Sequence, residues 1–219
     1  MSYESKIEIL LKKYSDNSIY RAGLSAIPYI GGALDILLTS GIHKKSQERF
    51  QIFLNELENQ IKSVDESKLN YSYLESEEFY DLFIQTSNLV IKTRLKEKIK
   101  WYSTIMTSSL ISDFNNHMKG EDILNIIEGL TENDIRLIKL ISEYLESNDA
   151  QRINRDTIFM ASSFSDLSKD LSEEFIFLGL LRLIKSGLII KHPAMSAPIP
   201  QLKFTITPMF GIIKEFMAK

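Results

Sequence analysis

The densest set of charged side chains in this chain is a run of cations followed by an aromatic pair. Its members are Lys92, Arg94, Lys96, Lys98 and Lys100, with Trp101 and Tyr102 directly after them. Such a cluster can bind the phosphates of a nucleic acid or an anionic membrane surface. On one continuous helix Lys92, Lys96 and Lys100 would share a face, because residues four apart stack.

The alternative interpretation of this basic run, which we favour, is a solvated helix whose lysines pair with acids on a neighbouring helix. The acidic stretch that could supply them contains Glu75, Glu77, Glu78 and Asp81.

Residue types that perform catalysis or bind metals are not grouped in the sequence. The histidines His43, His117 and His192 are far apart and lack the spacing of metal ligands. Residues 66–68 have the E-x-K spelling of some metal-dependent nucleases, but they lie in a polar linker without flanking strands. Motifs of the H-E-x-x-H, P-loop and G-x-S-x-G kinds are absent. We therefore expect a protein that is not an enzyme and that uses no metal and no cofactor.

The composition of the chain further narrows the functional classes to which it can belong. The chain has 219 residues, an apolar share of 44%, a formal net charge of −3 and a pI of about 5.7. A dedicated nucleic-acid binder usually carries a basic excess, because phosphate neutralisation supplies most of its affinity, so this charge disfavours that class. The absence of cysteine excludes disulfides and thiolate metal sites and fits a reducing compartment. The polar residues 1–5 predict no signal peptide, and hence a cytoplasmic location.

Residues 22–41 form an almost wholly apolar segment with unusual interruptions. These are Pro28, the pair Gly31 and Gly32, and Asp35 beside Leu34. The interpretation we favour is a buried helical hairpin or a kinked core helix, in which the glycine pair lets helices approach closely. The second is an element that contacts a membrane when the protein is activated. A spanning helix needs about 20 apolar residues, and a carboxylate such as Asp35 is costly in lipid.

Apolar periodicity predicts helices through the first 120 residues. One face of a long helix over residues 44–64 is marked by Phe50, Phe53, Leu54, Leu57, Ile61 and Val64. Ser72 with Glu75 predicts a capping box. A helical region follows toward residue 114, and a break near residues 92–94 could interrupt it. We place the domain boundary near Gly120, so that residues 1–120 form a helical bundle.

Residues 121–219 show a different order of elements. After a short helix around 124–130, the pattern predicts a helix capped by Thr131, a short helix over 154–161 and a third from Ser172 to Gly187. Two strand candidates, 188–190 and 202–206, flank a proline-rich loop, and Thr207-Pro208 opens a last helix. Three helices followed by a hairpin indicate a winged-helix module. The expected fold class is therefore mainly α: an N-terminal helical bundle followed by a winged-helix module with a small two-stranded β wing.

The charge at the start of the third helix of this module bears on its partner. In DNA-binding helix-turn-helix proteins, the exposed residues near the start of the recognition helix meet base edges and phosphates. Here those residues are Glu173 and Glu174, whose carboxylates repel phosphate. The cations Arg182, Lys185 and Lys203 offset them only in part. We therefore expect the module to pack against protein, with DNA binding as the alternative.

Several segments resemble the bacterial abortive-infection alpha (Abi-alpha) family. They are residues 96–106 around Trp101, the following residues 122–134, and residues 187–189 and 206–211, which look like that family's closing wing and last helix. The resemblance covers about residues 77–216. It implies a phage-defence or mobile-element protein of bacteria with an all-helical body and a winged helix, and it supplies no catalytic residues.

Two functional hypotheses follow. The first is a non-enzymatic interaction or effector protein of bacterial antiphage defence, which binds a protein partner or a second copy of itself and contacts a membrane only on activation. The second is a winged-helix DNA-binding regulator that uses the basic run and the wing. Affinity for DNA that falls steeply with salt would favour the second hypothesis.

Overall fold

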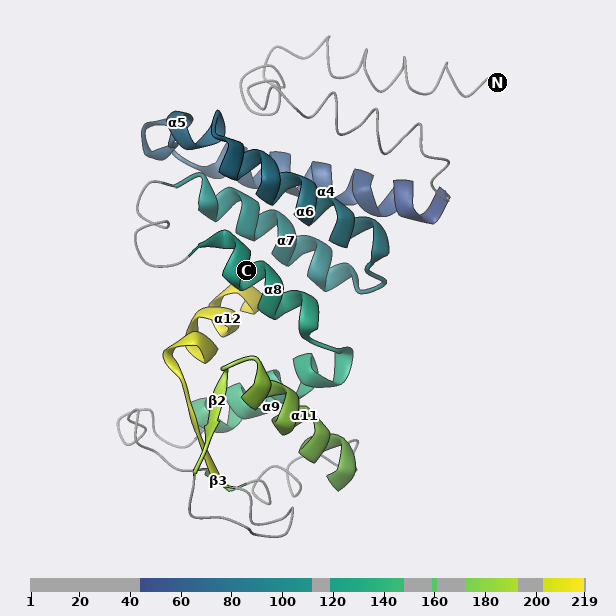
Figure 1. The fold of residues 1–219 in the computed structure, drawn as a ribbon, viewed down its shortest axis with the longest axis vertical. Coiled ribbons are helices and arrows are strands. Elements are labelled where there is room, and N and C mark those ends of the chain that lie inside the picture. The colour runs from purple at the N-terminus through teal and green to yellow at the C-terminus, as the bar shows by residue number, and fades with distance from the viewer. Residues whose placement is uncertain (1–43, 112–118, 148–158, 161–171, 193–202, 219) are drawn as a thin grey trace. The chain divides into compact units, whose positions relative to one another are not determined.

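The computed structural model of the chain is mainly helical, with one small antiparallel sheet (Figure 1). It describes residues 44–111, 119–147, 159–160, 172–192 and 203–218. The predicted apolar hairpin, with Pro28, Gly31, Gly32, Leu34 and Asp35, lies outside these residues. The chain divides into two compact units, Met1–Leu124 and Asn125–Lys219, and the division falls within one helix, α8 (Gly120–Gly129). The expected class, mainly α with a small sheet, is therefore confirmed.

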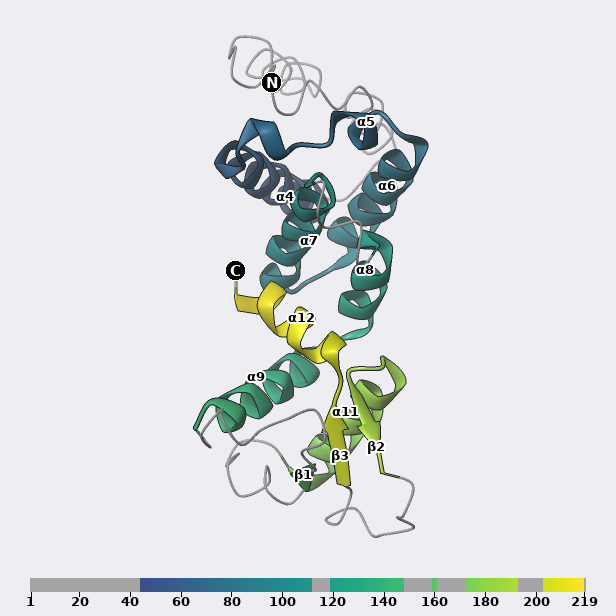
Figure 2. The same cartoon turned by 90° about the vertical axis from the view of Figure 1, so that its left-hand side faces the viewer.

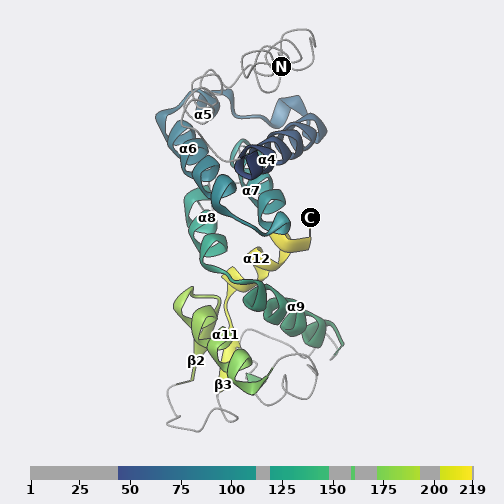
Figure 3. The same cartoon turned by 90° about the vertical axis from the view of Figure 1, so that its right-hand side faces the viewer.

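Three helices build the described part of the first unit: α4 (Lys44–Ser63), α6 (Glu77–Lys92) and α7 (Lys96–Ser109). Each packs against the other two (Figure 3). The long helix predicted over 44–64 is confirmed, and its apolar face is buried against the neighbours. The largest fully buried side chains of this core include Phe53, Phe79, Phe83, Tyr102 and Ile105. Burial of this much apolar and aromatic surface is the dominant stabilising contribution to such a unit.

The connection from α4 to α6 contains a short 3-10 helix, η1 (Glu66–Lys68), and one helical turn, α5 (Tyr71–Leu74). The predicted capping box of Ser72 and Glu75 is wrong, because Ser72 lies inside α5 and Glu75 ends it. The residue that caps α6 is Ser76, whose hydroxyl accepts a hydrogen bond from the Phe79 N–H at 3.2 Å. Ser76 can cap the helix because its backbone is extended, and the two acids that follow it in the first turn stabilise this helix end.

The second unit contains α9 (Glu132–Ser147), α11 (Glu173–Lys185) and α12 (Pro208–Ala218), together with strands β1 (Phe159–Met160), β2 (Ile189–Lys191) and β3 (Lys203–Ile206). The strand order is β1-β3-β2, with both pairs antiparallel (Figure 2). Phe159 is in register with Phe204, and Ile189 with Ile206.

Strand β1 corrects the sequence prediction of a helix over 154–161, and it adds a third strand beside the two that were predicted. Within that range the structure describes residues 159 and 160 alone, and these are extended. The physical reason is that β3 has two edges. The hairpin with β2 occupies one of them, and β1 satisfies the backbone N–H and C=O groups along the other.

Gly187 turns the chain from α11 into β2. It has a φ of 73°, in the left-handed region, as its predicted position after the helix requires. The Leu188 N–H donates to the Leu183 carbonyl at 2.9 Å and the Gly187 N–H to the Ile184 carbonyl at 3.0 Å. These two bonds form a Schellman motif. They terminate α11 and bring Leu188, which is fully buried, under the helix.

We expect Gly187→Ala to lower the free energy of unfolding of the second unit by about 1–2 kcal/mol, because an L side chain is strained at this φ. Open space surrounds the position, so the strain comes from the backbone alone. Hydrogen exchange of the α11 and β2 amides would measure it. The control is Gly211→Ala in α12, which also meets open space but has a helical backbone, and which should be neutral or stabilising by up to about 1 kcal/mol. Equal protection in both variants would contradict the expectation.

Candidate functional site

The start of α11 presents two carboxylates to solvent. Ser172 caps the helix by accepting a hydrogen bond from the Phe175 N–H at 3.4 Å, and both Glu173 and Glu174 are exposed. The Ser172 hydroxyl hydrogen-bonds the Glu174 carboxylate, and the backbone N–H of Glu174 assists, so the pKa of Glu174 lies below its ordinary value. Glu174 therefore carries full negative charge at neutral pH, and it lies at the helix end where the dipole stabilises negative charge.

The outward face of α11 is apolar beyond this acidic start. Its exposed fractions are 51% for Phe175, 48% for Leu178 and 41% for Leu181. The opposite face, with Ile176, Gly179, Leu180 and Leu183, is buried in the core of the second unit. Exposed large apolar side chains repeated along one regular helix mark a surface that another polypeptide can cover. The sequence alone does not show which of the apolar side chains of this helix point outward, because helical spacing leaves open which face meets the core.

Strand β2, which packs against α11, adds a further exposed apolar residue. Ile190 has an exposed fraction of 58%, the largest among the exposed large apolar side chains of the described residues. Its neighbour Ile189 is only 1% exposed, because alternate residues of a strand point to opposite faces. The hairpin therefore also turns one apolar side chain toward solvent.

The cation nearest the middle of α11 is already paired. Arg182 Nε lies 2.9 and 2.8 Å from the two carboxylate oxygens of Asp134 on α9, and Arg182 Nη2 lies 2.8 Å from Asp134 Oδ1. Asp134 is fully buried, and its Oδ2 also accepts hydrogen bonds from Thr131 N–H at 2.8 Å and Thr131 Oγ1 at 2.7 Å. Hydrogen bonding to this carboxylate raises the pKa of Arg182 above its ordinary value. Arg182 therefore does not offset the two exposed acids toward a phosphate.

A glycine permits this pairing. A Cβ atom on Gly179 would lie 2.8 Å from Leu137 Cδ2 and 3.4 Å from Asp134 Oδ1, so α11 approaches α9 more closely than any side chain would allow. Leu137 is itself buried, so it has little room to move. The inner face of α11 is thus fixed against α9, and this fixes the direction in which the outer face points.

The basic run lies on two helices. α6 ends at Lys92, Thr93 is extended, and α7 begins at Lys96. The predicted stacking of Lys92, Lys96 and Lys100 on one helix face is therefore wrong. The physical reason is that Ile99 is buried in the core of the first unit, with Leu95 half-buried beside it, and α7 can bring them there only after the chain turns at the extended Thr93.

Burial divides the residues of the run. Lys92, Arg94, Lys96 and Lys100 are exposed, whereas Lys98 and Trp101 retain exposed fractions of 6% and 3%. The latter two are therefore part of the packed interior and not of an anion-binding surface. The sequence spacing alone does not distinguish the buried residues of the run from the exposed ones. The reason is that the helix is interrupted at Thr93, so residues before and after it do not share one helical face.

The predicted pairing with an acidic stretch is not found for the exposed lysines of the run, Lys92, Lys96 and Lys100. Glu77 begins α6 and Lys92 ends it, and a helix of 16 residues is about 24 Å long. Among the described residues, no ion pair joins the exposed lysines of the run to Glu77, Glu78 or Asp81.

The start of α4 adds cations to the same place. Ser46 Oγ and Arg49 Nη1 each donate a hydrogen bond to the Ile91 carbonyl at 3.0 Å, which ties the first two turns of α4 to the end of α6. Lys44 and Lys45 are exposed in the first of these turns. Arg49 contributes to the stability of the fold here, because a cation stabilises the carbonyl end of a helix. We call the resulting exposed set the basic corner: Lys44, Lys45, Lys92, Arg94, Lys96 and Lys100.

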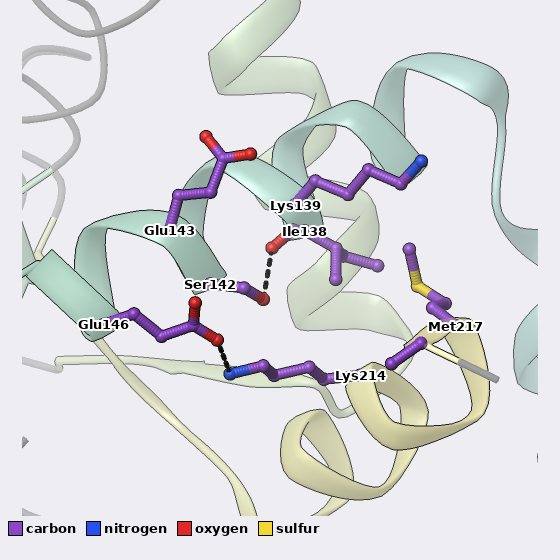
Figure 4. A pocket seen from close by; sticks show the side chains of 8 residues that line it. Ile138, Lys139, Ser142, Glu143, Glu146, Lys214 and Met217 are labelled. Atoms are coloured by element: carbon purple, nitrogen blue, oxygen red, sulfur yellow. Dashed lines mark hydrogen bonds and ion pairs between the residues drawn. The ribbon is translucent and has the colours of Figure 1, made fainter.

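A shallow pocket of about 220 Å³ lies between α9 and α12 (Figure 4). Some of its polar groups already have partners: Ser142 Oγ donates to the Ile138 carbonyl at 2.7 Å, and Lys214 Nζ lies 2.7 Å from Glu146 Oε1. The volume is below the roughly 300–1,000 Å³ of typical ligand pockets. This pocket therefore carries no argument for a substrate site.

The residues considered for metal chemistry do not come together in the described part of the chain. Residues 66–68 form η1, where Glu66 accepts a hydrogen bond from Tyr71 Oη at 3.1 Å. Hydrogen bonds from the side chain and backbone N–H of Ser67 lower the pKa of the capping Asp65. No group of three or more metal-ligating side chains occurs among the described residues. His43 and His117 lie outside them.

We expect Asp134→Asn to lower the free energy of unfolding of the second unit by about 2–3 kcal/mol, less than for a fully buried ion pair because Arg182 is partly exposed. The double variant with Arg182→Gln should cost less than the sum of the single changes. Hydrogen exchange of the α9 and α11 amides would measure both. Fluorescence of Trp101, the only tryptophan, reports the first unit and should not change. Additive effects would contradict the coupling.

None of the described helices has the length and apolar character needed to cross a membrane. No family model, curated protein or solved structure matches the chain. The resemblance to the Abi-alpha family therefore remains a prediction.

Proposed function

We propose that this chain is a non-enzymatic interaction protein whose C-terminal unit is a winged helix that binds polypeptide in place of DNA. The single observation that carries the proposal is the composition of the exposed side of α11. That side begins with Glu173 and Glu174 and continues with Leu178 and Leu181, while Arg182 is held by the buried Asp134.

The order of elements supports the winged-helix assignment. A helix, a short strand, a second long helix and a hairpin follow each other as α9, β1, α11, β2 and β3, and the hairpin pairs with the first strand through β3. In this arrangement α11 takes the position of the helix that meets the DNA groove in DNA-binding relatives of the motif. A helix that reads DNA needs hydrogen-bond donors and cations on its outer face, near its start. On α11 that start carries carboxylates and the middle carries leucines, and the exposed cation Lys185 comes only in the last turn.

The chemistry of the face favours protein as the partner. Leucine and phenylalanine gain free energy when they are removed from water, at about 25 cal/mol per Å² of apolar area, and a nucleic-acid backbone offers little apolar area in return. Protein interfaces combine such an apolar centre with a polar rim. Glu174 at one end of the face and Lys185 at the other supply a rim of this kind.

The setting in which the protein acts is part of the proposal. The resemblance of residues 96–106, 187–189 and 206–211 to the Abi-alpha family supports a cytoplasmic effector of bacterial antiphage defence. In this proposal the apolar residues 22–41 contact a membrane only after activation, and the α11 face binds the protein partner that controls it.

We expect the chain to reduce the plating efficiency of at least one phage when it is produced in a bacterial host, and Leu178→Glu with Leu181→Glu to remove that protection. Two charges at the centre of an apolar contact prevent it from forming. A matched control is Ile52→Glu on α4, a similarly exposed apolar residue in the first unit, which should retain protection. Full protection by the double variant at equal protein level would reject the α11 face as the functional surface.

A second candidate function is nucleic-acid binding through the basic corner, which the convergence of exposed cations from α4, α6 and α7 favours. If it holds, the purified chain shifts DNA at low salt, and the affinity falls linearly with salt on logarithmic axes.

In that case we expect Lys96→Glu with Lys100→Glu to lower the slope of this plot by about two, since each phosphate contact contributes about one. Lys119→Glu with Lys139→Glu changes the net charge equally at exposed positions outside the corner and should leave the slope unchanged. Absence of any shift by the wild-type chain at low salt would remove this candidate.

A further inference from the structure

The residues of α11 that point most directly away from the core form an ordered stripe of four: Glu174, Leu178, Leu181 and Lys185. Their spacing of four, three and four residues places them on one side of an α-helix. All four are exposed. We call them the α11 stripe. Along the helix it has an acid, two leucines and a base, so its two ends carry opposite charge.

This order makes the stripe complementary to a copy of itself. If two α11 helices pack antiparallel about a twofold axis between residues 179 and 180, Glu174 of one copy faces Lys185 of the other. Leu178 then faces Leu181, and each pair occurs twice. An isologous contact requires this reciprocity, in which residue i meets j and j meets i.

The charges also specify the direction of packing. In a parallel arrangement the same residues of the two copies would face each other, Glu174 against Glu174 and Lys185 against Lys185. Like charges placed together across an interface disfavour that arrangement, whereas the antiparallel one forms two ion pairs and sets the helix dipoles in opposition. The paired Arg182 adds no uncompensated charge at the edge of the stripe.

Apolar surface borders the stripe and enlarges the contact. Phe175, adjacent to Glu174, is the most exposed apolar residue of α11. Because Gly179 and the Arg182–Asp134 pair fix the inner face on α9, the stripe is presented without rearrangement of the helix. A preformed surface loses less conformational entropy on association.

We propose that the partner covering the α11 stripe is a second copy of this chain, bound antiparallel. The inference rests on the proposed function, because it uses the same face of α11, and it goes further by naming the occupant and its orientation. Two single helices bury less than the roughly 800 Å² per partner of a standard interface, so the dimer is a weak one, with a dissociation constant of about 10–100 µM.

The test is the molecular mass of the purified full-length chain, measured by sedimentation equilibrium over about 1–300 µM, a range that brackets the expected dissociation constant. The wild type shifts from monomer toward dimer across this range. Leu178→Glu with Leu181→Glu stays monomeric throughout, and Ile52→Glu dimerises as the wild type does. Circular dichroism establishes that each variant is folded.

A charge exchange tests the orientation. Glu174→Lys and Lys185→Glu each weaken the dimer by about tenfold, since each change creates two like-charged contacts in place of two ion pairs. The double variant, Glu174→Lys with Lys185→Glu, restores the dissociation constant of the dimer to within about threefold of the wild-type value. Each ion pair is formed again, with its two charges exchanged between the positions. If either residue acted only within its own monomer, the double variant would not restore dimerisation.

Each other outcome overturns the inference. A wild-type chain that is monomeric at all concentrations excludes self-association. A dimer that persists in the double leucine variant belongs to another surface, and failure of the exchange to rescue excludes the antiparallel pairing. The proposed function is judged separately: it survives these outcomes if the double leucine variant still loses phage protection, and it fails if that variant protects fully.

Discussion

The buried carboxylate of Asp134 is the interaction on which the second unit depends. It closes the start of α9 through Thr131 and holds Arg182 of α11 with both of its oxygens. A charge taken out of water in this way is tolerated only when its hydrogen-bonding capacity is satisfied. One side chain therefore fixes the cap of one helix and the position of the next, and with it the direction in which the outer face of α11 points.

Local signals in the sequence predicted much of this fold. Thr131, Gly187 and Pro208 were assigned to their helix ends because capping, left-handed backbone and proline at the first helical position are decided within a few residues. The Arg182–Asp134 pair is different, since its members are 48 positions apart. From the local sequence, Asp134 is an acid in the first turn of a helix, and nothing local marks such a residue as buried. Strand β1 was missed for the same reason, because its partner β3 lies far along the chain.

The basic run shows how tertiary structure reassigns residues that are neighbours in sequence. Spacing alone placed all its cations on one helix, but the extended Thr93 separates α6 from α7 and carries Lys98 into the interior. The same fold brings Lys44 and Lys45 to the remaining cations through the hydrogen bonds at the Ile91 carbonyl. The basic corner therefore contains some cations that the sequence spacing predicts and others that it does not. Which cations lie in it depends on which helix ends meet in the fold.

The two sides of α11 place different demands on its sequence. The inner side requires a glycine for close approach and large apolar residues for the core, and these alone would give a helix with a polar outer face. Leucines at 178 and 181 are not required by that packing, since both are exposed by more than two fifths. A core-forming requirement therefore cannot account for them, and neither can phosphate recognition, because Glu174 precedes them on the same side. An apolar partner with a cation near one end and an acid near the other satisfies both observations, and an antiparallel copy of α11 has that distribution of charge.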